Sequence, residues 1–280
     1  MSPDVSEPVP AEPREVDRSL LDYRPPYWDE SLPFVLLWSE KAGCTTLLTW
    51  FLHHAGQLPQ AENYELWVHD WERDVMRARD GYLDLVHEAL EDGAPVFQLV
   101  RDPYHRAVSS YLALLEEFDD ESNAVNPVRR EIRTWLYGDP YVQYSFSIRQ
   151  YLAWLDTQDV DQIERHLAPQ TTALDESLSP RLIRLENLAT ELARIEEEFG
   201  LEPVDLSTLP QPPHHANRTD LRFADRSVIA DMQPAIPQLK GPGLPVADDF
   251  LADDVRADIG RIYARDIERL GYSPPDVSDG

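Results

Sequence analysis

The sequence predicts an α/β protein in which helices cover a parallel sheet. Two observations carry this prediction. Short apolar runs alternate along the chain with stretches of helical periodicity, and the strongest apolar runs lead through a polar loop directly into a helix. A strand, a helix and a further strand in succession form the unit from which parallel sheets are built.

The predicted strands are short and apolar, as expected for strands that are buried on both faces. They are residues 34–38 (FVLLW), 65–68 (ELWV), 96–100 (VFQLV) and 182–185 (LIRL). The run at 65–68 is the weakest of the four. Gly93 and Pro95 punctuate the chain just before the run at 96–100, which supports a strand that begins there.

Helices are expected where apolar residues recur every three or four positions. The expected helical spans are 46–54, 73–91, 103–117, 129–136, 147–155, 160–167, 187–199 and 253–270. The start at 103 is the best defined, because Asp102 is a favourable N-cap and Pro103 fits the first turn of a helix.

The two ends of the chain differ from its body in composition. Residues 1–30 are acidic and rich in proline, so we expect a flexible arm, and residues 273–280 read as a tail. Residues 31–272 are expected to form a single domain. Within it, residues 202–247 hold eight prolines and little periodicity. So long an irregular stretch favours a functional flap.

Composition excludes several classes of function. With 25 Lys and Arg against 52 Asp and Glu, the formal net charge of the 280-residue chain is −27, so it is a poor candidate for binding nucleic acid or an anionic membrane. No apolar run approaches the roughly 18–20 residues of a transmembrane helix, so we expect no membrane insertion and a cytoplasmic location. The single cysteine, Cys44, excludes a zinc site built on several cysteines. The acidity fits either ordinary solubility or a cytoplasm of high salt.

The first informative loop is residues 39–46 (SEKAGCTT), which follows a predicted strand and opens a helix. Small residues let the backbone approach an anion, and a helix N-terminus presents N–H groups and positive partial charge. Lys41 and the hydroxyls of Thr45 and Thr46 complete a phosphate cradle. The order differs from the nucleotide P-loop, in which the lysine follows the second glycine. Lys41 is one of only two lysines in the chain, which favours a specific role over a surface role.

The second informative loop is residues 101–111 (RDPYHRAVSSY), which also joins a predicted strand to a helix. Arg101 offers a planar pair of donors to a phosphate, and Ser109, about two turns into the helix, offers a hydroxyl. Arg106 adds a second guanidinium. The simpler alternative is a local ion pair between Arg101 and Asp102 beside a helix cap.

Together the two loops resemble the sulfotransferase superfamily that uses 3′-phosphoadenosine 5′-phosphosulfate (PAPS). Its hallmarks are a lysine-containing loop and a segment of the type R-D-P-x-x-R-x-x-S-x-Y. The two loops are most similar to those of the carbohydrate sulfotransferase branch, sulfotransferase family 2, whose first loop reads K-x-A/G-C-T. Four later segments are also similar: HLAPQ at 166–170, IRLENL at 183–188, NRT at 217–219 and YARDIERLGY at 263–272. The resemblance spans about residues 32–272.

This resemblance implies a P-loop-like three-layer sandwich with a central parallel sheet of about four to five strands, flanked by helices. It also implies an enzyme that transfers the sulfuryl group of PAPS by in-line displacement and releases adenosine 3′,5′-bisphosphate (PAP). The acceptor would be a small molecule or a glycan, and the branch favours a hydroxyl or amine of a glycan or glycolipid.

The resemblance also implies roles for particular residues. The backbone of residues 42–46 and two threonine hydroxyls would hold the 5′-phosphate, and Lys41 would contact the bridging oxygen, so that no metal is required. Arg101 and Ser109 would hold the 3′-phosphate. The cofactor-binding residues implied are Lys41, Ala42, Gly43, Cys44, Thr45, Thr46, Arg101, Ser109, Arg218 and Thr219.

Sulfuryl transfer to a hydroxyl requires a general base, which related enzymes place between the two loops. His69 occupies such a place, with Asp70 beside it to orient the ring, and is the preferred candidate. Glu65, Glu62 and His87 remain alternatives. The candidates for contact with the acceptor are His166, Trp67 and Trp71, each of which also fits a packing role.

Two other functions are compatible with part of the pattern. One is a P-loop phosphotransferase that uses ATP like a kinase, although ATP has no 3′-phosphate for Arg101 and Ser109 to hold. The other is a non-catalytic nucleotide-binding protein of the same fold. Binding of PAP against ATP discriminates the first of these from a sulfotransferase.

Overall fold

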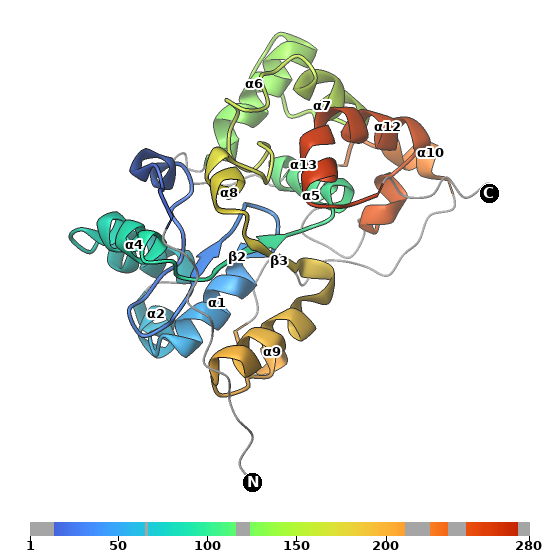
Figure 1. Ribbon diagram of the computed structural model, residues 1–280. Coiled ribbons are helices and arrows are strands. Elements are labelled where there is room, and N and C mark those ends of the chain that lie inside the picture. The colour runs from blue at the N-terminus through green and yellow to red at the C-terminus, as the bar shows by residue number, and fades with distance from the viewer. Residues whose placement is uncertain (1–13, 65–66, 116–123, 211–224, 235–244, 274–280) are drawn as a thin grey trace. The chain divides into compact units, whose positions relative to one another are not determined.

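The computed structural model describes residues 14–64, 67–115, 124–210, 225–234 and 245–273. The chain, drawn in Figure 1, divides into two compact units, and the segments of the two units alternate along the sequence. The first unit comprises Met1–Trp38, Cys44–Leu99 and Thr172–Pro210, and the second comprises Ser39–Gly43, Val100–Thr171 and Gln211–Gly280. The expectation of one domain over 31–272 stays a prediction.

The first unit contains a small parallel sheet of three strands flanked by helices, which confirms the α/β class. The strands are β1 (Val35–Leu37), β2 (Val96–Val100) and β3 (Arg181–Arg184), in the order β1-β2-β3. In the parallel pair of β1 and β2, Val35 lies opposite Val96 and Leu37 opposite Gln98. Every residue of β1 and β2 is buried, as a strand covered on both faces requires.

The helices of the first unit agree fully with the predicted spans only near 46–54 and 187–199. They are α1 (Cys44–His54), α2 (Leu58–Tyr64), α3 (Val68–Trp71), α4 (Tyr82–Glu91), α8 (Ala173–Leu178) and α9 (Leu188–Phe199), with the π-helical segment η2 (Glu72–Met76) after α3 and short 3₁₀ turns η1 (Arg18–Asp22), η3 (Leu185–Asn187) and η4 (Leu206–Thr208). An aromatic cluster centred on Phe34, which contacts Trp50, Phe97 and Phe199 at centroid distances of 5.2–6.1 Å, joins α1, β2 and α9. The end of the N-terminal arm is anchored where Tyr27 stacks on Trp38 at 5.4 Å.

The second unit is helical. It holds α5 (Pro103–Leu115), α6 (Val125–Tyr137), α7 (Ile148–Leu155), α10 (Arg226–Ala230), the 3₁₀ turn η6 (Ala247–Phe250), α12 (Asp253–Ile262) and α13 (Ala264–Arg269). Tyr111 of α5 lies at its centre and contacts Phe146, Tyr151 and Phe250 at 5.7–6.2 Å. Asp102 caps α5 as predicted, because its carboxylate accepts the His105 N–H at 2.9 Å.

The strand expected at 65–68 is wrong where the structure describes it. Trp67 is extended, and Val68 begins α3. The buried side chains Val68, Glu72 and Met76 are spaced by four, so one face of a continuous helical stretch is buried there. Among the described residues the sheet therefore has three strands, and the larger sheet expected from the resemblance is not seen there.

Three helical predictions also differ from the structure. The helix expected over 73–91 is interrupted by turns at 77–81, which separate η2 from α4. Residues 160–167 form turns, because Asp159 and Glu164 accept the backbone N–H groups two residues ahead and so compete with helix formation. The helix expected over 253–270 is divided at Tyr263, which leaves helical geometry and buries its ring. The described part of residues 202–247 is irregular apart from η4 and α10, and the rest of that stretch lies outside the described residues.

The described part of the chain offers no helix that combines the length and the apolar character needed to cross a bilayer.

Candidate functional site

The lysine loop, residues 39–43, is a tight turn of the second unit, and Lys41 lies in the left-handed region with φ 65°. A non-glycine residue there costs about 1–3 kcal/mol, which must be offset by the surroundings. The amide of Ala42 donates to the carbonyl of Ser39 at 3.3 Å, and Gly43 follows at φ 95°. The loop therefore holds its one lysine in a conformation that glycine would adopt more easily.

Two arginines of the second motif hold this loop by consecutive carbonyls. Arg101 donates from Nη1 to the Lys41 carbonyl at 3.0 Å, and Arg106 donates from Nε to the Glu40 carbonyl at 2.9 Å. Arg106 is only 1% exposed and also donates to the Arg165 carbonyl at 3.4 Å. The sequence position of Arg106 suggested a donor for a bound anion. In the structure its buried guanidinium instead donates to backbone carbonyls of the protein.

The carboxylates beside the two loops have cationic or donor partners. Glu40 lies 3.4 Å from the Arg165 guanidinium. His105 lies between Asp102, at 3.2 Å, and Asp248, at 2.9 Å. The hydrogen bonds of these carboxylates raise the pKa of His105. Burial acts against the charge of Asp102, but its hydrogen bonds with His105 outweigh burial and lower the pKa of the carboxyl.

The serines of the second motif have different environments. Ser109 is half-buried two turns into α5. Ser110 is fully buried and donates to the His166 carbonyl at 2.6 Å, which attaches the HLAPQ segment to α5. The His166 ring faces the Glu164 carboxylate at 3.0 Å, and about a third of its side chain is exposed. Its role in acceptor binding stays a prediction.

A third feature of the lysine loop is an orphaned hydroxyl. Ser39 is buried, and its Oγ has no hydrogen-bond partner among the residues that the structure describes. A buried polar atom without a partner carries a free-energy cost, which a bound water or ligand group removes.

In the first unit, residues 44–46 form the first turn of α1 and are half-buried. His69 contacts this turn, because its Nε2 lies 3.1 Å from Thr45 Oγ1. Its Nδ1 is hydrogen-bonded to Glu72, which is itself paired with Arg77. A base candidate therefore lies beside a predicted phosphate-binding hydroxyl, with a carboxylate that fixes the orientation of its ring.

The orienting carboxylate differs from the expected one. Asp70 pairs with Arg73 at 3.0 Å, whereas Glu72 binds the imidazole. Glu72 stands three residues after His69, so the two side chains share a helix face once the stretch is helical. The incorrect strand assignment concealed this partner, which helical periodicity over 68–76 would have revealed.

The protonation of His69 bears on its predicted role as a base. Burial disfavours the charged ring, but hydrogen bonds with Cys44 and Glu72 outweigh burial and raise the pKa of His69 to about 10. At neutral pH the imidazole of this structure thus holds a proton, and it becomes a base only when that proton leaves. Its role as the general base stays a prediction.

The rival bases and the tryptophans have separate environments. His87 binds the Val16 carbonyl at 2.8 Å and so anchors the N-terminal arm, while Glu62 is exposed on α2. Trp67 is 42% exposed, and its ring meets His69 edge to face at 4.4 Å. Trp71 packs on Tyr64 and donates to Gln57 at 3.3 Å, which favours packing.

Three predicted site residues lie outside the described residues. They are the base candidate Glu65 and the flap residues Arg218 and Thr219. Among the described residues, no group of three or more His, Cys, Asp or Glu side chains is arranged to hold a metal ion.

Comparison of the chain with protein-family models, with curated proteins and with solved structures finds no match.

Proposed function

We propose that the chain is a sulfotransferase that moves the sulfuryl group of PAPS to a hydroxyl or amine of an acceptor. The observation that supports this most is the 3.0 Å hydrogen bond from Arg101 to the Lys41 carbonyl. It joins the two loops whose sequences independently suggested phosphate binding. An ordinary surface lysine would need no such support and no left-handed backbone.

The donor set of the lysine loop suits a phosphorylated nucleotide. Lys41 and Arg101 contribute cationic groups, Ser109 a half-buried hydroxyl, and Ser39 a buried hydroxyl whose oxygen lacks a partner among the described residues. The nearby carboxylates Glu40 and Asp102 face Arg165 and His105. These partners reduce the repulsion that an arriving phosphate would otherwise meet.

When bound, PAPS supplies an activated sulfuryl group attached to a bisphosphate leaving group. Lys41 places positive charge where the bridging oxygen gains negative charge, and Arg101 and Ser109 bind the 3′-phosphate. The first turn of α1, with Thr45 and Thr46, binds the 5′-phosphate through its N–H groups and hydroxyls. Catalysis then rests on positioning and electrostatics, as it does in phosphoryl transfer.

The acceptor class follows the resemblance to the carbohydrate branch, so we propose a glycan or glycolipid hydroxyl. His69 is the proposed base, and the exposed ring of Trp67 beside it provides an apolar surface for a sugar.

Calorimetric titration tests the nucleotide assignment. PAP should bind about 100-fold more tightly than ADP or ATP, a difference of about 2.7 kcal/mol, because only PAP carries a 3′-phosphate. Arg101→Ala should remove most of this preference. Arg261→Ala, which removes an exposed arginine paired with Asp156 and Asp258, is the control and should retain it. Equal affinity of the wild-type protein for PAP and ATP would contradict the proposal.

A transfer assay tests the chemistry. The protein is incubated with ³⁵S-labelled PAPS and a panel of glycans, glycolipids and small alcohols, and the label in the acceptor is measured. Lys41→Ala should abolish transfer while the circular dichroism spectrum is unchanged. Undiminished turnover by this variant would show that the assigned role of Lys41 is wrong.

A further inference from the structure

Gln170 continues the pairing of β2 beyond the end of the strand. Arg101, the residue after β2, donates its backbone N–H to Gln170 Oε1 at 2.9 Å, and Gln170 Nε2 donates to the Arg101 carbonyl at 2.8 Å. The side-chain amide thus satisfies both backbone groups of one residue, as a neighbouring strand would. The side chain of Gln170 is fully buried, whereas Arg101 is half-buried.

Asp266 in turn holds the segment that carries Gln170. One carboxylate oxygen accepts the Gln170 N–H at 2.7 Å, and the other accepts the N–H and the hydroxyl of Thr171 at 3.0 and 2.7 Å. Asp266 lies on α13 and is only 1% exposed. Hydrogen bonds to a charged acceptor are stronger than those between neutral groups, so this carboxylate is a firm anchor.

The constraint reaches the lysine loop through Arg101. The backbone of Arg101 is fixed by Gln170, and its guanidinium donates to the carbonyl of Lys41, the residue with φ 65°. A continuous chain of hydrogen bonds therefore runs from Asp266 through Gln170 and Arg101 to Lys41, all within the second unit.

We propose that Gln170 and Asp266 are positioning residues that set the place of Arg101 and, through it, the conformation of the lysine loop. The effect on nucleotide binding rests on the proposed function, whereas the effect on the loop does not. Neither residue contacts a nucleotide in this assignment. Both act through Arg101.

Hydrogen exchange measures the loop without any nucleotide. Gln170→Leu removes both bonds to Arg101 at nearly constant volume, and Asp266→Asn removes the anchoring charge. Each should speed deuterium uptake in peptides that cover residues 39–43. The matched control is Tyr263→Phe, which removes a buried hydrogen bond, from Tyr263 to the Leu167 carbonyl at 2.7 Å, outside the chain to Arg101. It should leave uptake in these peptides unchanged.

Nucleotide binding measures the consequence. The ratio of affinities for PAP and adenosine 5′-monophosphate reports the 3′-phosphate contact. Gln170→Leu and Asp266→Asn should lower this ratio about 10-fold to 100-fold, because misplacing a binding group by about an ångström has effects of that size. Gln170→Leu should have no further effect in an Arg101→Ala background, a coupling that loss of general stability would not produce.

The outcomes separate the two proposals. Unchanged uptake over residues 39–43 in Gln170→Leu, or equal effects of Gln170→Leu and Tyr263→Phe, overturns the positioning role. Faster uptake in the variants, combined with a wild-type protein that does not prefer PAP, supports positioning and overturns the sulfotransferase proposal. If Asp266→Asn does not fold, Gln170→Glu provides the second variant: it keeps the acceptor for the Arg101 N–H, loses the donor, and should give an intermediate effect.

Discussion

Lys41 combines a cationic side chain with a left-handed backbone, and these two properties make opposite demands on its residue type. The backbone favours glycine, whereas the proposed chemistry needs an amine. Arg101 donates to the carbonyl of Lys41, and Arg106 donates to the carbonyl of the residue before it, Glu40. Strain retained at one residue and supported by buried partners is typical of functional positions.

Lys41→Gly should therefore stabilise the protein and abolish transfer. Relief of the left-handed backbone should raise the free energy of unfolding by about 1 kcal/mol, while loss of the amine removes the charge at the bridging oxygen. Urea unfolding and the transfer assay measure the two effects. The matched control is Ser179→Gly, since Ser179 also has positive φ, 47°, but is exposed at the end of α8. It should show the gain in stability without loss of activity. A loss of stability in Lys41→Gly would contradict the argument from strain.

The raised pKa of His69 predicts a pH dependence of the reaction. If the neutral ring is the base, kcat/KM should rise about tenfold per pH unit from pH 7 and level off as the pH nears 10, because only the deprotonated fraction accepts a proton. His69→Gln should remove this rise. If kcat/KM of the wild-type protein does not change between pH 7 and 9, a group other than His69 is the general base.

Stability should follow the opposite course with pH. The folded-state pKa of His69 lies above the usual value, so the protonated ring stabilises the fold fully below about pH 6.5, and this contribution is lost as the pH rises through 10. Comparing the urea midpoints of the wild-type protein and His69→Gln between pH 6 and 10 measures that loss: the gap between them should narrow. A gap that does not change with pH would contradict the assigned shift.

Elements with strong local signals could be predicted from the sequence, and elements decided by packing could not. β2 lies at the predicted residues, and α5 begins where Asp102 and Pro103 indicated, because a cap and a punctuated apolar run are local features. The run at 65–68 was ambiguous because four residues cannot distinguish the two periodicities, and its last residue, Val68, begins a helix. At the break, the hydroxyl of Tyr263 donates to the Leu167 carbonyl, 96 residues away, and no local pattern indicates such a contact.

The same distinction applies to the candidate site. The sequence indicated Lys41 and Arg101 through residue type and loop position, and the structure joins them. Gln170 and Asp266 lie in two segments that resemble the family, but the sequence did not indicate their contacts, because the connection crosses 69 residues from Arg101 to Gln170 and 96 from Gln170 to Asp266. Contacts of such separation leave no periodic signal in a single sequence.

The capping box of α7 offers a test at the scale of one element. Ser147 Oγ accepts the Gln150 N–H at 3.3 Å, and Gln150 Oε1 accepts the Ser147 N–H at 2.9 Å. Ser147→Ala should lower the free energy of unfolding by about 1 kcal/mol, since it leaves a helix N–H without its partner. Thr134→Ala is the control, because its exposed hydroxyl bonds only back along α6 and its loss should change stability little. Equal effects of the two substitutions, measured by urea unfolding, would show that the cap contributes nothing specific.

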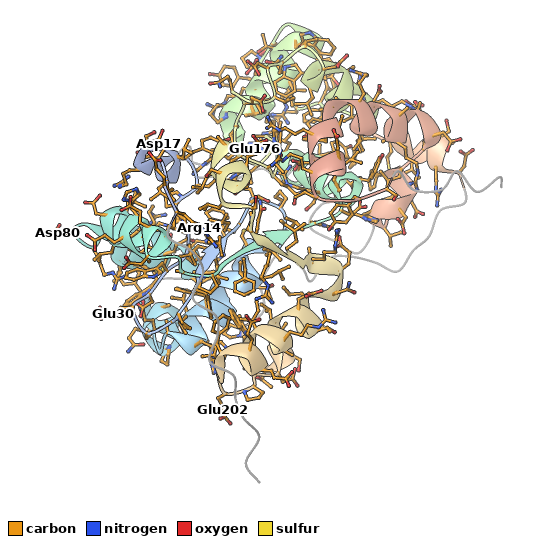
Figure 2. All side chains as sticks on the ribbon, in the orientation of Figure 1. Arg14, Asp17, Glu30, Asp80, Glu176 and Glu202 are labelled. Carbon is orange, nitrogen blue, oxygen red and sulfur yellow. The ribbon has the colours of Figure 1, made fainter. Side chains whose placement is uncertain are left out.

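At the scale of the whole molecule, the net charge of −27 coexists with a site that we propose binds a phosphorylated nucleotide. The two are compatible because net charge acts over the surface, whereas binding depends on local donors. Several acidic side chains of the first unit, Asp17, Glu30, Asp80 and Glu202 among them, lie exposed at its periphery (Figure 2). Repulsion among surface carboxylates disfavours a compact state in general, and salt screens it.

Stability should consequently rise with salt. At about 1 M NaCl the Debye length falls to about 3 Å, so repulsion between separated surface carboxylates is almost removed, and the urea midpoint should increase relative to that at about 0.01 M, where the length is about 30 Å. Replacing Glu30, Asp80 and Glu202 by their amides should raise stability at low salt and reduce the increase, because the same repulsion is then removed by mutation. Sucrose in place of NaCl separates screening from general solvent exclusion, since it stabilises both proteins equally. An unchanged urea midpoint between low and molar NaCl would contradict the hypothesis that the acidity is an adaptation to high salt, and would favour a role in solubility alone. If the urea midpoint of the charge-reduced variant rises with NaCl as much as that of the wild-type protein, the ions act by a mechanism other than screening, because screening acts only on charges that are present.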